Sequence, residues 1–328
     1  MGSMTDCAIP RLPNHRQAGL SGSMTALVTP FKKGRIDEDA FVFLCQRQIE
    51  RGTAALVPCG TTGEVSTLSR AEQLRLIELA VKVAAGRVPV IAGAGSNCTA
   101  TAVDLVQEAA RLGADAVLSV VPYYNRPSQE GIYQHFKAVQ SCSDLPVLVY
   151  DVPARSGIRL TTDTIERLAD LPNIVGLKDA SGDLERAKAI RRLLRNDFLL
   201  LCGDDCRVGE YLALGSAGCI SVTGNVAPAL CATLHAVWEA NEFSLFQHLR
   251  VLIDTLSEAM CVETNPIPVK WALARLGLAG DELRLPLTPL AQSRHAAVLH
   301  ALDAIVDAEA AKAGEMAAAR SGRQNAAA

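Results

Sequence analysis

A lysine closes an apolar stretch of the chain, where a charged side chain is uncommon. The run Ile174–Leu177 ends in Lys178 and predicts a short buried strand followed by a turn. Burial disfavours the charged form of an amine, and the neutral amine is the form that attacks a carbonyl. Alternation puts Lys178 on the same face as Gly176, so it would be a nucleophile if that face lined a barrel. The alternative is a strand-end lysine in solvent, paired with Asp179.

Hydroxyl, phenol and guanidinium groups follow other apolar runs. Thr61 and Thr62 follow the apolar run Ala54–Cys59, and Tyr124 follows the run Ala116–Val121. Tyr150 ends the run Pro146–Tyr150, and Arg155 comes five residues later. Phenols and hydroxyls can move the protons of an imine without a histidine. Thr62 with turn N–H groups suits a keto-acid carboxylate, and the fork of Arg155 suits a second one. Each motif alone also fits a turn, a surface loop or a solvated charge, but together at one rim they favour imine chemistry.

The sequence lacks the motifs of phosphate, dinucleotide and metal sites. No phosphate-binding P-loop motif occurs, and Gly93-Ala94-Gly95 lacks the third glycine of a dinucleotide site. We predict no metal, because no histidine pair has H-x-x-x-H spacing. The histidines lie on predicted helices or in the N-terminal segment: His15, His135, His235, His248, His295 and His300.

Composition limits the class of protein. The 328 residues are 49% hydrophobic with a net charge of −3 and 4% aromatic residues, which favours neither a nucleic-acid nor a membrane partner. No apolar stretch is long enough to span a membrane. The ten cysteines show no C-x-x-C pairing, which suits the reducing cytoplasm.

Strand-like and helix-like segments alternate eight times, which predicts a (β/α)8 TIM barrel rather than an open doubly wound sheet. The expected strands are Met24–Thr29, Ala54–Cys59, Val88–Ala92, Ala116–Val121, Pro146–Tyr150, Ile174–Lys178, Phe198–Cys202 and Gly218–Val222. Expected helices between them include Asp37–Glu50, Arg70–Ala85, Thr99–Leu112, Gln129–Cys142, Thr162–Ala169 and Leu184–Leu194. In this fold the active site lies at the carboxyl ends of the strands, where the polar groups above stand.

The strand pattern stops after the eighth unit. Helices are expected at Phe243–Met260, Pro266–Gly277 and Pro289–Ala313, as an appended three-helix subdomain. We therefore divide the chain into a disordered N-terminal segment or tag remnant (1–21), a catalytic barrel (22–242), the helical subdomain (243–313) and a frayed tail (314–328). Lys270 lies in the subdomain, and we predict a structural role for it.

The candidate residues belong to longer motifs that resemble the dihydrodipicolinate synthase family, within the N-acetylneuraminate lyase superfamily. The resemblance runs from about Gly22 to about Ala301 and rests on Gly60–Glu64, Pro122–Pro127, the Tyr150 to Arg155 spacing, Gly176–Lys178 and Asn265–Trp271. It implies a barrel that condenses pyruvate with L-aspartate-4-semialdehyde to 4-hydroxy-tetrahydrodipicolinate in lysine and diaminopimelate biosynthesis. It implies no cofactor beyond a covalent pyruvate imine, and a homotetramer built as a dimer of dimers.

By matching position, the resemblance implies a proton-transfer group around the imine. Lys178 would form the imine and Tyr150 would be its general acid and base. Thr61 would relay protons between Tyr150 and Tyr124, with Tyr124 supplied by a neighbouring subunit.

The resemblance implies binding residues as well. Thr62 would bind the pyruvate carboxylate and Arg155 the carboxylate of the semialdehyde. Gly203 and Ile220 would line the pocket through their backbones. Two alternatives stay open: a lyase of a sugar keto acid such as sialic acid, which uses the same lysine and tyrosine, and a non-catalytic barrel that binds a keto acid without forming the imine.

Several positions depart from the family pattern. Asp151 stands where the family usually has Asn, and alternation points it away from Tyr150, so we expect little effect on chemistry. Asn97 and Tyr123 match the lysine-binding allosteric pocket of inhibited family members. Three other positions of that pocket, commonly Ser, His and Glu, carry different residues, so we expect weak or absent lysine feedback: Val65, Gln73 and Thr101.

Overall fold

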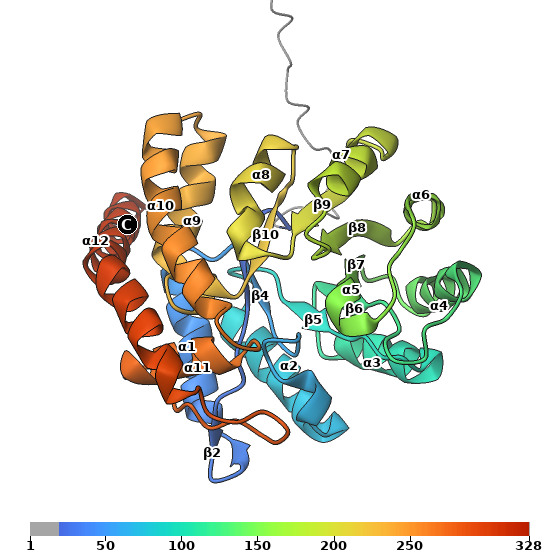
Figure 1. The fold of residues 1–328 in the computed structure, drawn as a ribbon, viewed down its shortest axis with the longest axis horizontal. Helices are drawn as coiled ribbons and strands as arrows, with labels where there is room; N and C mark the ends of the chain where they lie inside the picture. Colours follow the sequence, from blue (N-terminus) through green and yellow to red (C-terminus); the bar gives the residue numbers. More distant parts are fainter. Residues whose placement is uncertain (1–19, 328) are drawn as a thin grey trace, which may run out of the picture.

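Eight parallel strands form one barrel in the computed structural model, which describes residues 20–327 (Figure 1). The hydrogen-bonded order is β4-β1-β10-β9-β8-β7-β6-β5, and a parallel bridge between Leu56 and Val90 joins the two ends. The predicted (β/α)8 barrel is confirmed. The barrel strands are β1 (Gly22–Ala26), β4 (Ala55–Val57), β5 (Ile91–Gly93), β6 (Ala116–Val120), β7 (Val147–Asp151), β8 (Ile174–Asp179), β9 (Leu199–Cys202) and β10 (Gly218–Ser221).

Helices surround the barrel, and several begin where the sequence predicted. Ser69, Ser128, Thr161 and Asp183 each accept a backbone N–H with the side chain, which satisfies donors that a helix start leaves free. The barrel helices are α1 (Glu38–Glu50), α2 (Arg70–Ala84), α3 (Thr99–Arg111), α4 (Gln129–Ser141), α5 (Pro153–Ser156), α6 (Thr162–Ala169), α7 (Leu184–Leu193), α8 (Val208–Ala213) and α9 (Pro228–Glu239).

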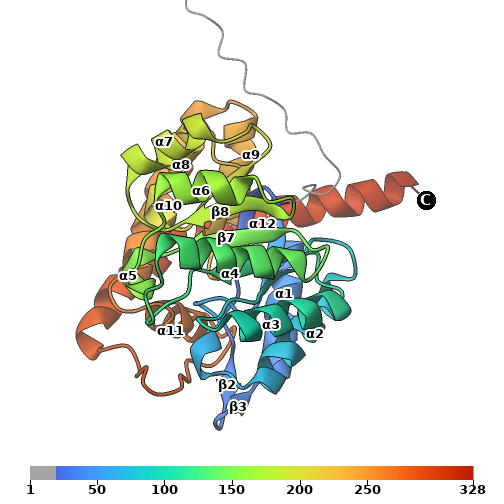
Figure 2. The same ribbon diagram turned by 90° about the vertical axis from the view of Figure 1, so that its right-hand side faces the viewer.

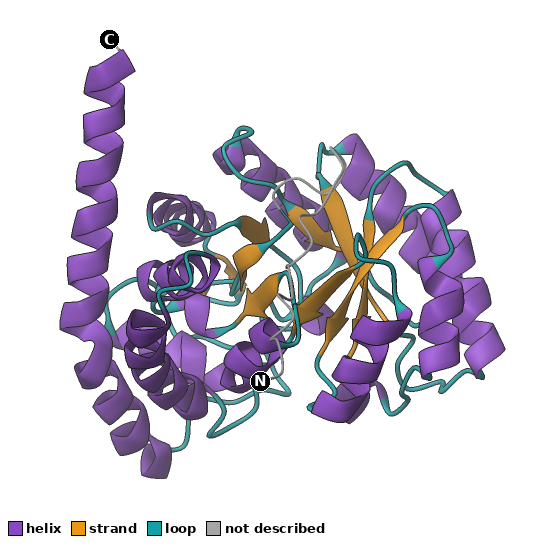
Figure 3. Cartoon of the chain, turned by 90° about the horizontal axis from the view of Figure 1, so that it is seen from above, coloured by secondary structure: helices purple, strands orange, loops and turns teal. Residues whose placement is uncertain are grey.

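Three further helices follow the barrel: α10 (Phe243–Met260), α11 (Ile267–Arg275) and α12 (His295–Ala327). α12 continues through 314–327, the segment for which the sequence predicted a frayed tail. Figures 2 and 3 show its last turns projecting beyond the barrel. The guanidinium of Arg320 donates to the carbonyl of Ile49 at 3.2 Å, which ties this part of α12 to the end of α1.

The hydrophobic core has two parts. One cluster fills the barrel interior and includes Met24, Ile91, Leu148 and Leu201, and a larger one lies between the strands and the helices. Successive strand residues alternate between the two clusters, so the inward face of each strand end meets the interior. Within residues 20–327, no helix is long and apolar enough to cross a membrane.

A small hairpin was not predicted. Strands β2 (Phe31–Lys32) and β3 (Arg35–Ile36) pair antiparallel outside the barrel sheet. Each strand has two residues, too few for a detectable alternation in the sequence. The expected N-terminal segment 1–21 falls almost entirely outside the described residues.

Candidate active site

The Lys178 amine lies at the end of β8 against the ring of Tyr150. Its Nζ is 4.3 Å from the ring centroid, and the Lys178 side chain is 6% exposed. The two residues are register partners on the adjacent strands β7 and β8, so both project from the same face. Tyr150 belongs to the interior cluster, which places the amine at the barrel interior rather than in solvent.

Of the two glycines near this lysine, Gly203 leaves room for its side chain and Gly176 does not. A Cβ on Gly203, just after β9, would lie 3.1 Å from Cε of Lys178. A Cβ on Gly176 would first meet the carbonyl of Leu199 at 2.6 Å and the side chain of Leu148 at 2.9 Å. Although Gly176 shares a strand face with Lys178, the nearest neighbours of such a Cβ are core residues, and Gly203 makes the room for the lysine.

The Gly-Thr-Thr-Gly turn follows β4 and presents Thr62 to the rim. Gly63 N–H donates to the carbonyl of Gly60 at 3.1 Å, and Glu64 N–H to that of Thr61 at 3.1 Å. The hydroxyl oxygen of buried Thr62 accepts a hydrogen bond from Nδ2 of Asn265 at 3.0 Å. The hydroxyl proton of Thr62 is therefore free to be donated to a bound carboxylate.

Asn265 begins one of the motifs that carry the resemblance, but the sequence did not predict a role for it in the site. Besides its bond to Thr62, its backbone carbonyl accepts a hydrogen bond from Arg155 at 3.2 Å. It thus joins the two residues expected to bind carboxylates, one from each side of the rim. Asn265 lies between α10 and α11, outside the strand series, so counting strand ends gave no signal for it.

The remaining candidates lie farther out or are buried in the barrel wall. Tyr124 has a positive φ of 71° and is 88% exposed, while Tyr123 is 38% exposed. Ile220 is buried in β10 within the interior cluster. Near the expected allosteric position, the carbonyl of Asn97 accepts a hydrogen bond from Asn125 at 2.8 Å.

Lys270 is buried in an ion pair, as its predicted structural role requires. Its Nζ lies 2.6 Å from a carboxylate oxygen of Glu64 and donates to the carbonyl of Thr29 at 2.9 Å. Burial lowers the pKa of Lys270, while the carboxylate opposes that shift. Its amine is committed to two acceptors, which leaves Lys178 as the candidate nucleophile.

The described residues offer neither a metal-binding group nor a histidine at the rim beside Lys178. Burial lowers the pKa of both His135 and His235 to about 4. Within residues 20–327, no three His, Cys, Asp or Glu side chains are grouped so as to hold a metal ion.

Comparisons with known proteins identify the family of the chain. A profile of the Dihydrodipicolinate synthetase family matches residues 19–305. The 4-hydroxy-tetrahydrodipicolinate synthase of Hyphomonas neptunium is 50% identical over 295 residues, covering 89% of this chain and 98% of that protein. The synthase structure from Methylacidiphilum fumariolicum SolV has a TM-score of 0.87 at 38% identity, covering 90% of this chain and 99% of that one. The chloride-inhibited dihydrodipicolinate synthase of Acinetobacter baumannii, solved with pyruvate, has a TM-score of 0.84 at 45% identity, covering 87% and 98%. The chain therefore belongs to the dihydrodipicolinate synthetase family.

Proposed function

We infer that the protein is a lyase that condenses pyruvate with L-aspartate-4-semialdehyde to 4-hydroxy-tetrahydrodipicolinate, a step of lysine and diaminopimelate biosynthesis. The observation that carries this inference is the amine of Lys178, buried at a strand end 4.3 Å from the ring of Tyr150. Relatives about half identical over most of their length carry the name of this enzyme. The sugar-acid lyase and the non-catalytic barrel have no such support.

The chemistry follows from the amine. Nζ of Lys178 adds to C2 of pyruvate, and loss of one water leaves an imine. Tyr150 gives a proton to the departing hydroxyl and later takes one from C3, which yields an enamine. C3 of the enamine attacks the aldehyde carbon of the second substrate, whose oxygen takes a proton to become a hydroxyl, and the imine at C2 is restored. The amino group of that substrate then replaces Lys178 at C2, closing the ring and releasing the lysine. No cofactor takes part in this scheme.

Binding roles are assigned to the residues around this pair. The hydroxyl of Thr62, held by Asn265, binds the pyruvate carboxylate, and Arg155 binds the carboxylate of the semialdehyde. Gly203 and Ile220 line the pocket through their backbones. Thr61 relays protons between Tyr150 and Tyr124.

The proposal includes a homotetrameric assembly and a cytoplasmic location. Tyr124 reaches the site of a neighbouring subunit, and its 88% exposure in the single chain supports this. The assembly is a homotetramer made of two dimers. Every cysteine that the structure describes is free, which suits a cytoplasmic protein.

The first experiment traps the imine. Borohydride reduction with pyruvate should add one reduced pyruvyl group to the peptide that carries Lys178, and Lys178→Arg should lose the adduct. The matched control is the other buried lysine, where Lys270→Arg should keep the adduct in any folded fraction. An adduct on Lys270, or none on the wild-type protein, would overturn the assignment.

The acceptor is tested separately. Turnover with pyruvate should be fast with aspartate-4-semialdehyde and at least about a hundredfold slower with N-acetylmannosamine, because Arg155 offers a fork for a carboxylate that the sugar lacks. Faster turnover with the sugar would favour the sugar-acid lyase instead.

A further inference from the structure

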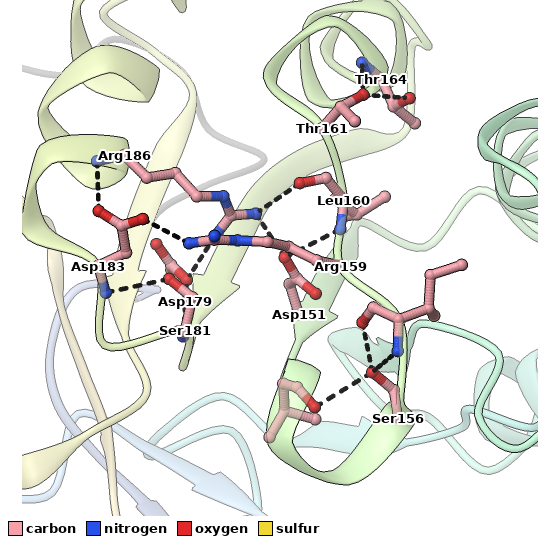
Figure 4. A network of polar contacts seen from close by, with 12 residues as sticks. Asp151, Ser156, Arg159, Leu160, Thr161, Thr164, Asp179, Ser181, Asp183 and Arg186 are labelled. Carbon is pink, nitrogen blue, oxygen red and sulfur yellow. Dashed lines mark hydrogen bonds and ion pairs between the residues drawn. The ribbon is translucent and has the colours of Figure 1, made fainter. Parts of the chain in front are cut away.

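A buried arginine bridges the ends of the two strands that carry Lys178 and Tyr150. Figure 4 shows Arg186, from α7, between Asp151 at the end of β7 and Asp179 at the end of β8. Its Nη1 donates to Oδ1 of Asp179 at 2.8 Å, and its Nη2 donates to Oδ2 of Asp151. Both carboxylates are fully buried, and Arg186 is 9% exposed.

The bridge lies one residue beyond the catalytic pair. The strand register pairs Tyr150 with Lys178, and Asp151 with Asp179. Because side chains alternate along a strand, Tyr150 and Lys178 face the barrel interior, while the two aspartates face α7. Whatever fixes the two aspartates relative to each other therefore also fixes the two strand positions next to them.

The arginine is itself held from two directions. Asp183 caps α7 and accepts the backbone N–H of Arg186 at 2.9 Å, and Arg159 pairs with Asp183 at 2.6 Å. The guanidinium of Arg186 also donates a hydrogen bond to the carbonyl of Leu160 at 3.3 Å. A planar fork with several fixed N–H groups can reach two carboxylates and a carbonyl at once, which a lysine ammonium cannot do with the same geometry.

The charges of this cluster do not balance, so maximal stability does not explain it. Two carboxylates face one guanidinium, and among the described residues Oδ1 of Asp151 and Oδ2 of Asp179 have no hydrogen-bond partner. Burial, and after it the negative charge of Asp179, raises the pKa of Tyr211 on α8. A buried ion cluster is often no more stable than apolar packing of the same volume, which leaves precise placement as its benefit.

We propose that Arg186 is a positioning residue for the reaction: by bridging Asp151 and Asp179, it sets the placement of the Lys178 amine relative to Tyr150. This rests on the proposed roles of Lys178 and Tyr150. Asp151 acts here as an acceptor for the bridge, and an asparagine oxygen at the same position can accept the same hydrogen bond.

The test compares two substitutions of nearly equal volume. Asp151→Asn and Asp151→Leu both leave one carboxylate for one guanidinium, so both should keep the fold, but only the asparagine accepts from Arg186. We expect Asp151→Leu to form the trapped imine at least about tenfold more slowly, with kcat reduced and the KM for pyruvate within about threefold, since misplaced groups slow chemistry more than binding. Asp151→Asn should stay within about threefold of wild type.

Two more variants complete the design. Arg186→Lys keeps the positive charge but loses the planar fork of the guanidinium. It should therefore form the trapped imine as slowly as Asp151→Leu does. Arg167→Lys, in an exposed pair with Glu130, is the control and should be unchanged. Equal imine rates for Asp151→Leu and Asp151→Asn, with thermal unfolding showing both folded, would overturn the proposal. If the wild-type protein forms no adduct on Lys178, the proposed function fails instead.

Discussion

The space beside the side chain of Lys178 depends on a residue that has no side chain, Gly203. Gly203 follows β9 and donates its N–H to the carbonyl of Asp179 at 2.9 Å, so its backbone passes directly beside the end of β8. A methyl group there would meet Cε of Lys178 and the Cβ of Ala180, at 3.1 and 2.9 Å. Gly203 therefore sets the space available to the end of the Lys178 side chain.

We predict that Gly203→Ala slows imine formation at least about tenfold while the protein stays folded, because a small displacement of a nucleophile is costly. The measurement is the rate of borohydride trapping with pyruvate. The matched comparison is Gly176→Ala, whose methyl group would press on the backbone of Leu199 and should mainly lower stability. An unchanged trapping rate in Gly203→Ala would contradict the steric role of this glycine.

The pH dependence of stability should report on Asp151. Burial is the largest cause that raises the pKa of Asp151 from 3.8 to about 6, with Arg186 opposing it and Asp179 adding to it. The folded state thus holds this proton more tightly than the unfolded state does, so the contribution of Asp151 to stability falls as the pH rises from about 4 to about 6.

Asp151→Asn should remove that loss and raise the free energy of unfolding by roughly 1–3 kcal/mol at pH 7, with little change near pH 4. Urea unfolding of both proteins across this range measures it. Asp104→Asn is the control, because the exposed partner Arg70 lowers the pKa of Asp104 and that substitution should not raise stability at pH 7. A stability gain that is the same at pH 4 and pH 7 would exclude titration of Asp151 as the cause.

At the scale of elements, one ion pair ties the helical subdomain to the barrel rim. Lys270 of α11 reaches Glu64, whose left-handed backbone (φ 54°) ends the Gly-Thr-Thr-Gly turn beside Thr62. The other oxygen of Glu64 accepts the N–H of Arg284 at 3.3 Å. The turn that presents Thr62 is therefore supported from the appended helices, which are part of the site rather than an independent addition.

Lys270→Met should destabilise the protein by about 3–5 kcal/mol, because it leaves the Glu64 carboxylate buried without its cation. The double variant Glu64→Gln with Lys270→Met should recover part of that loss, since the remaining buried group is neutral. Chemical unfolding of the wild type, both single variants and the double variant gives the coupling. Additive effects of the two substitutions would show that the pair is not coupled in the folded protein.

The elements were predictable from the sequence to a greater degree than the contacts among them. The positions of all eight barrel strands were predicted within a few residues, because most of these strands contain a short apolar run. Lys178 could be found because a lysine ending such a run is unusual. The site contacts of Asn265 and Arg186 could not be predicted, because their partners are far away in sequence, Thr62 for one and Asp151 for the other.

At the scale of the whole molecule, the family resemblance raises the question of regulation by lysine. Tyr123, together with Asn97, stands at the position expected for lysine binding in the family. The structure adds a fact about a third position of that pocket. Gln73 is buried, and its Nε2 donates to the carbonyl of Gly93 at 2.8 Å, so its side chain is directed into the protein.

We therefore predict that lysine inhibits this protein weakly or not at all. A pocket for the amine of lysine needs a carboxylate, and exposed Thr101 supplies none, while Gln73 is already committed to Gly93. Steady-state turnover with sub-millimolar lysine should match turnover without it. Thr101→Glu restores the missing charge and should increase lysine sensitivity, whereas Thr99→Glu, on the same helix, should not. Strong inhibition of the wild-type protein in that range would show that lysine binds without the carboxylate.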